Sequence, residues 1–135
     1  MKKVNYIVAA AAVVLIVVLT SVRTPQKQGP PAYNAAAEVS VSGTVEETQE
    51  FFCAISDEPG AHLVLRTDQG KLLVHVAPAR FLRSQQFVFN RNDQVSVVGT
   101  RVHYQGEDAM LAREVTRGND VLILRDHQGH PLWTR

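Results

Sequence analysis

An uncharged run of residues at the N-terminus constrains what the rest of the chain can build. Residues 4–22 carry no charged side chain, and alanine, valine, leucine and isoleucine fill residues 7–19 without interruption. The nineteen residues of this run would extend roughly 28 Å as a helix at about 1.5 Å each, close to the hydrocarbon thickness of a bilayer. We therefore expect residues 1–22 to be an N-terminal transmembrane helix that anchors the protein in the cytoplasmic membrane.

The charges around this run predict an orientation. Lys2 and Lys3 precede it, so the positive-inside rule leaves the N-terminus in the cytoplasm. We expect a single-pass protein of the inner membrane with its C-terminal domain in the periplasm or another extracytoplasmic space. A cleaved secretory signal is the alternative, although residues 20–23 do not form the small-x-small site that a signal peptidase needs.

The remaining chain divides into a linker and one domain. Residues 23–37 are rich in proline, glycine and alanine and predict an extended linker. Residues 38–135 are long enough for one hydrophobic core without disulfides. This domain has 10 basic and 13 acidic residues, a net charge of −3. Nucleic acid is therefore an unlikely partner, because phosphate-binding domains normally carry a basic stripe.

Alternating residues predict a mostly β domain. Residues 39–45 alternate valine with serine and threonine, and Gly43 marks a bend in this first strand. Residues 46–61 lose the alternation and end in a turn-forming cluster. We expect a long acidic loop there, with a strand extension near Phe51 and Phe52.

Two short apolar segments, residues 62–66 and 71–76, predict a hairpin with Gly70 at a positive φ. Pairing Arg66 with Lys71 places the leucines and valines of both strands on one face. The same register places His62 opposite His75 on the other face.

The second half of the domain predicts a short helix and further strands. Pro78 opens a helix of about two turns over residues 79–83. Residues 94–104 and 109–115 predict the fourth and fifth strands, and residues 121–123 one more short strand.

Three strands, a short helix and two strands form the element order of a five-stranded Greek-key OB-fold barrel. On this order, the Gly43 bend, and residues 93–99 and 112–115, the domain resembles small exported bacterial OB-fold proteins. The resemblance covers residues 39–116 and implies the helix between strands 3 and 4. A different small antiparallel barrel or sandwich remains an alternative from the same pattern.

The resemblance also implies a ligand face on the outer side of the second and third strands. The residues at that address are His62, Val64, Arg66, Lys71, Leu73 and His75. Because fold alone does not define chemistry, the ligand class stays open. We expect a partner protein or peptide of the cell envelope, or a metal ion; oligonucleotide or oligosaccharide is the alternative.

Cys53 is the single cysteine of the chain, so it has no intramolecular disulfide partner. It is a buried small apolar residue, a soft metal ligand or the site of a mixed disulfide. Cross-strand imidazoles lie about 5 Å apart at Cβ and are able to share one ion. Cys53, His62 and His75 are therefore a candidate site for copper or zinc, with a hydrogen-bonded histidine pair as the simpler interpretation.

Catalysis has little support in the sequence. There is no nucleophile-elbow serine, no glycine-rich phosphate loop and no carboxylate pair on a recognisable scaffold. A redox protein or enzyme that uses Cys53, activated by His62 or His75, is the remaining alternative. We expect a binding module that is not an enzyme and needs no obligatory cofactor.

Overall fold

The structure, a computed structural model, describes residues 29–134, so the membrane helix predicted at residues 4–22 lies outside it. Within residues 29–134, no helix is long and apolar enough to cross a membrane. This part of the chain forms six strands, one short α-helix and two 3-10 turns. The elements are η1 (Ala35–Ala37), β1 (Glu38–Cys53), β2 (Glu58–Thr67), β3 (Gly70–Pro78), α2 (Ala79–Ser84), β4 (Gln94–Tyr104), β5 (Glu107–Arg117), β6 (Asp120–Ile123) and η2 (Leu132–Thr134).

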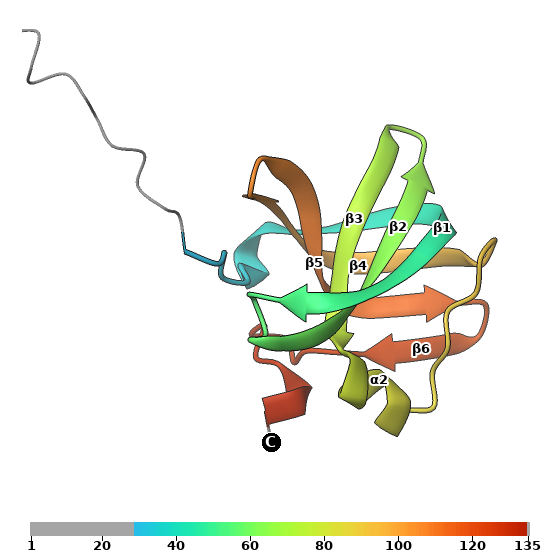
Figure 1. The fold of residues 1–135 in the computed structure, drawn as a ribbon. Coiled ribbons are helices and arrows are strands. Elements are labelled where there is room, and N and C mark those ends of the chain that lie inside the picture. The colour runs from blue at the N-terminus through green and yellow to red at the C-terminus, as the bar shows by residue number, and fades with distance from the viewer. Residues whose placement is uncertain (1–28, 135) are drawn as a thin grey trace, which may run out of the picture.

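All six strands belong to one sheet of order β3-β2-β1-β4-β5-β6, in which every neighbouring pair is antiparallel (Figure 1). β3 also pairs in parallel with β5, from Leu73↔Ala109 to His75↔Leu111. β1 to β5 therefore form a continuous circuit of paired strands. The mostly β prediction is confirmed, including the short helix between the third and fourth strands. The further short strand predicted at residues 121–123 is β6, which pairs with β5 at the edge of the sheet and adds to the five strands of the expected element order.

β1 is much longer than the sequence predicted. It runs for 16 residues, and its second half pairs with β2 as far as Cys53↔Glu58. The long acidic loop expected at residues 46–61 is therefore wrong. The alternation is lost there because both the polar side chains and the two phenylalanines of residues 46–52 point largely away from the core. Pairing with β2 keeps this segment extended instead.

β1 changes partner halfway along its length. Its first half pairs with β4 and its second half with β2, and a bulge between Val45 and Glu47 shifts the register. Gly43 lies just before this point, and a Cβ there would stand 2.8 Å from the Arg66 carbonyl oxygen. The bend expected at Gly43 thus coincides with a close approach of two strands that only glycine permits.

The hairpin of β2 and β3 has the predicted register. Arg66 pairs with Lys71 and His62 with His75. Gly70 has a φ of 110°, as the turn required. The strands continue through Thr67 and Gly70, so the loop between them is two residues long.

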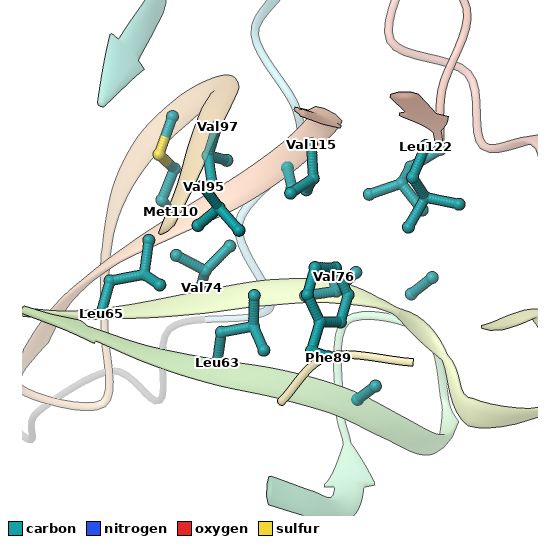
Figure 2. Packing of buried hydrophobic residues seen from close by; sticks show 14 of the residues in the cluster. Leu63, Leu65, Val74, Val76, Phe89, Val95, Val97, Met110, Val115 and Leu122 are labelled. Atoms are coloured by element: carbon teal, nitrogen blue, oxygen red, sulfur yellow. The ribbon is translucent and has the colours of Figure 1, made fainter. Parts of the chain in front are cut away.

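The core lies between the two halves of the sheet (Figure 2). Leu63, Leu65 and Val74 from the β2–β3 hairpin point toward residues of β4 and β5, and all three are completely buried. Their partners across the core include Val95, Val97, Met110 and Val115. The apolar face predicted for the hairpin is therefore the face that builds the core.

The C-terminal segment packs beside α2 at one end of the strands (Figure 1). Trp133 of η2 contacts the ring of Phe81 in α2, with ring centroids 5.9 Å apart. Arg80 of the same helix holds Glu58 at 2.7 Å and also donates to the Trp133 carbonyl oxygen. These contacts fix the chain end close to the start of β2.

A glycine-to-alanine pair tests the close approach of β4 and β5. At Gly99 a Cβ would lie 2.1 Å from the Leu111 carbonyl oxygen, whereas at Gly106, with φ of 80°, it would meet nothing within 4 Å. We expect Gly99→Ala to cost about 3 kcal/mol of unfolding free energy because backbone has to move. Gly106→Ala should cost only about 1 kcal/mol, from its positive φ. Urea unfolding of both variants measures the difference, and equal losses would contradict the packing at Gly99.

Candidate metal centre

Cys53, His62 and His75 come together from three strands. Cys53 ends β1, His62 lies in β2 and His75 in β3. Their ligand atoms all lie within 4.8 Å of one another. The Cys53 Sγ is 3.5 Å from the His75 Nδ1, and the two imidazole rings meet edge to face with centroids 4.7 Å apart.

Backbone pairing explains why these residues meet. The cross-strand pair His62↔His75 sits next to a bulge between Ala61 and His62. The β1–β2 hairpin then folds Cys53 back over this pair. Gly60 permits the approach, because a Cβ there would lie 2.9 Å from the Cys53 Cβ and 3.3 Å from the His62 Cε1.

His62 is buried, although the sequence placed it on an exposed ligand face. Its exposed fraction is 0%, because the ring of Phe51 in β1 stacks on it at 3.7 Å with an interplanar angle of 6°. Cys53 is also buried and His75 is half-buried. The expectation of an exposed His62 is therefore corrected: the second half of β1, which the sequence presented as a loop, covers it.

The other residues of the predicted ligand face separate into two groups. Val64 and Leu73 are half-buried, whereas Arg66 and Lys71 are exposed near the hairpin end. Lys71 and Arg66 both face Glu46, at 3.0 Å and 3.9 Å. The candidate ligands of this face therefore lie at the end of the hairpin that contains His62 and His75, away from Arg66 and Lys71.

Burial favours the neutral form of both imidazoles. It lowers the pKa of His62 to about 4, and the neighbouring His75 adds to this lowering. The Gly60 backbone acts in the opposite direction, although no hydrogen bond of good geometry reaches either ring nitrogen of His62. Burial likewise lowers the pKa of His75. Neutral rings have a free lone pair, which is the form that binds metal ions.

The arrangement is close to what a metal requires. With tetrahedral bond lengths, neighbouring ligand atoms lie about 3.3–3.6 Å apart, so the widest separation in the cluster, at most 4.8 Å, would contract by about 1.2–1.5 Å. The Cys53–His75 distance of 3.5 Å already fits. Both nitrogens of His62 are buried without a hydrogen-bond partner, which is costly unless a ligand satisfies one of them.

An open cavity leads to the cluster from outside. It has a volume of about 300 Å³ and is lined by Cys53, His75, Phe51, Phe52 and Tyr104, among others. Phe52 is 62% exposed at its rim. We call this space the outer cavity. It borders Cys53 and His75 but not His62, so an incoming ion would meet the thiol and His75 first.

A second, smaller space also borders the cluster. This inner cavity has a volume of about 20 Å³, and its lining includes all three cluster residues together with Ser56 and Arg125. Arg125 is 9% exposed. Sequence reasoning did not single out Ser56 or Arg125, because Ser56 lies in the turn at residues 54–57 without a distinctive motif and Arg125 is far along the chain from the histidines.

Aromatic rings and one carbonyl hold the Arg125 side chain. Its guanidinium lies 5.0 Å from the Tyr33 ring centroid and 4.9 Å from that of Trp133. Its NH1 group donates to the Gly129 carbonyl oxygen at 3.0 Å. Trp133 thus supports Arg125 and also forms part of the lining of the inner cavity.

The buried neutral His62 predicts a pH-dependent stability. Since its folded pKa is about 4 and its unfolded value about 6.5, the unfolded chain binds the extra proton between these values. Stability of the metal-free protein should be full above about pH 7 and fall by up to about 3 kcal/mol toward pH 4. Urea unfolding at pH 7, 6 and 5 measures this slope, which His62→Phe should flatten. His127→Phe, at an exposed histidine, should keep the original slope; a slope unchanged by His62→Phe would refute the assignment.

Comparison with known proteins gives a family for this chain. No curated protein matches the chain. A family model, that of the MamS/MamX magnetosome protein family, matches residues 37–122. The match covers more than half of the chain, from the start of β1 into β6, and includes Cys53, His62 and His75. The chain therefore belongs to the MamS/MamX magnetosome protein family, a bacterial, magnetosome-associated family.

Proposed function

We propose that this protein is a metal-binding module in which Cys53, His62 and His75 hold one copper or zinc ion. The observation that carries the proposal is the environment of the buried His62. Neither of its ring nitrogens has a hydrogen-bond partner of good geometry, and its ligand atom lies within 4.8 Å of those of a thiol and a second imidazole. A thiolate and two neutral imidazoles form a ligand set that suits both metals.

The surroundings favour a complex of low net charge. A thiolate with copper(I) is neutral, whereas a thiolate with zinc(II) retains one positive charge that burial would penalise. Copper(I) is therefore favoured by the apolar stack of Phe51 on His62. Zinc requires a compensating anion near the site.

The circuit of strands supports a finer description of the fold. β1-β2-β3-β5-β4 returns to β1 through antiparallel pairs and the single parallel pair of β3 with β5. We infer that this circuit is the OB-fold barrel and that the outer cavity occupies part of its ligand-binding side. The partner that delivers or accepts the ion would be an envelope protein that contacts the rim at Phe51 and Phe52, which are exposed.

The location proposed for this module is outside the cytoplasm and tethered to the membrane. It rests on the uncharged run at residues 4–22 and the two lysines before it. A tether would keep the metal site close to membrane proteins at high effective concentration.

Single substitutions test the metal site. We expect Cys53→Ser and His75→Ala each to weaken zinc and copper(I) binding by about a hundredfold or more, since a complete structural site gives about 10–16 kcal/mol shared among its ligands. The affinity is measured by competition with a chelator on the full chain, purified in detergent. Metal content after purification is measured in parallel by mass spectrometry.

His103→Ala is the matched control. His103 is exposed, lies in β4 and pairs with Asp108 at 2.8 Å, away from the cluster. Its affinity for both metals should equal that of the unchanged protein. Wild-type protein that binds neither ion at micromolar concentration, or a Cys53→Ser variant that binds as well as wild type, would end the proposal.

A reporter fusion tests the location. Alkaline phosphatase fused after Arg135 should be active, because this enzyme needs the oxidising space outside the cytoplasm to form its disulfides. Green fluorescent protein exported in the same position by the general secretory route should be dark. The opposite pair of results would place the domain in the cytoplasm and remove the tethered-module proposal.

A further inference from the structure

Buried polar atoms without partners gather around the inner cavity. Among residues 29–134, the buried side-chain nitrogen and oxygen atoms without a hydrogen-bond partner are Ser56 Oγ, both ring nitrogens of His62, and Arg125 Nε. All three residues line this one cavity of about 20 Å³. A space of roughly 10–15 Å³ is enough for one water-sized particle. The lining therefore calls for a single small polar occupant.

The hydrogen-bonding capacity of these groups defines the occupant further. A guanidinium only donates, and a serine hydroxyl is free to donate. When a metal takes the lone pair of one His62 nitrogen, the other nitrogen carries the proton and donates as well. Metal-binding histidines normally give that proton to a carboxylate, carbonyl or water. Here the Gly60 backbone acts on the His62 ring, but no hydrogen bond of good geometry reaches either ring nitrogen, so three donors are left for one acceptor.

The charge of Arg125 also favours an acceptor that is an anion. Arg125 is buried, and no carboxylate of the described residues lies within 4.0 Å of its guanidinium. Tyr33 beside it stays neutral, because burial and the neighbouring Glu38 raise the pKa of its hydroxyl to about 12. A buried cation with no counter-charge is costly. An anion in the inner cavity would remove that cost.

We propose that the inner cavity binds a small monatomic anion, with chloride as its biological ligand. The anion accepts hydrogen bonds from Arg125 Nε, from Ser56 Oγ and from the His62 nitrogen that the metal leaves free. Only this third contact rests on the proposed metal site; the other two exist without a metal. Chloride is the abundant anion whose size is nearest to that of water.

This arrangement couples the anion to the metal. An anion held by Arg125 and Ser56 fixes which His62 nitrogen is protonated and leaves the other nitrogen's lone pair for the ion. It also offsets the positive charge of Arg125, which lines the same cavity and would otherwise repel a metal cation on the thiolate. Each ligand therefore increases the affinity of the other by the same factor.

The test measures zinc affinity of the full chain in detergent, in sodium chloride and in sodium gluconate at equal ionic strength. Gluconate is too large for the inner cavity. We expect zinc to bind about tenfold more tightly in chloride, a typical coupling between two sites. The melting temperature of the metal-free chain should also be higher in chloride. Ser56→Ala and Arg125→Lys should reduce both effects strongly.

Arg101→Lys is the control, because Arg101 is an exposed arginine in β4. The Arg101→Lys variant should show the same differences in zinc affinity and melting temperature between the two salts as the unchanged protein. Any effect of chloride on free zinc in solution would appear equally in this variant. Equal zinc affinity and equal melting temperature in the two salts would overturn the anion site and leave water as the occupant. In that case the metal site could still stand, because zinc would bind with the same affinity in both salts. A chloride-dependent melting temperature without zinc binding would support the anion site and remove the metal proposal. If Arg125→Lys does not fold, the loss of the chloride effects in Ser56→Ala tests the anion site instead.

Discussion

The change of partner along β1 is the constraint on which the rest of the structure depends. One strand pairs with β4 in its first half and with β2 in its second half. At the junction, Val45 bonds through its backbone to Asn92 and Asp93, and Gly43 allows the Arg66 carbonyl to approach. The two halves of the sheet therefore face each other and enclose the core. The same strand then carries Phe51 over His62 and delivers Cys53 beside His75.

Much of the sheet was predictable because the hydrophobic pattern constrains register. In the β2–β3 hairpin only one pairing keeps the leucines and valines together, and that pairing also puts His62 opposite His75. The second half of β1 was not predictable in this way. Its outward side chains include glutamates and two exposed phenylalanines, so no period-2 pattern marks the strand. The burial of His62 was missed for the same reason, because the ring that covers it belongs to that segment.

The neighbourhood of the histidines was also only partly accessible from sequence. Cys53 could be proposed as a third group because it is the one thiol of the chain and follows an acidic segment near the hairpin. Ser56 and Arg125 carried no such signal. Arg125 is held at the inner cavity by its own contacts with Trp133, Tyr33 and Gly129, which depend on how the segment after β6 returns to the sheet. Long-range packing of this kind has no local pattern along the chain.

The order of these groups along the chain has a consequence for assembly. Cys53 and His75 are separated by 22 positions, and His62 lies between them, so the β1–β2–β3 meander contains the whole thiol and imidazole set. Such local contacts form early, because short loops are closed at little entropic cost. Arg125 and Trp133 are synthesised after all three of these residues. The wall of the inner cavity is therefore completed after the ligand set, and a nascent chain would present an open ligand set before the segment that contains Arg125 and Trp133 packs against it.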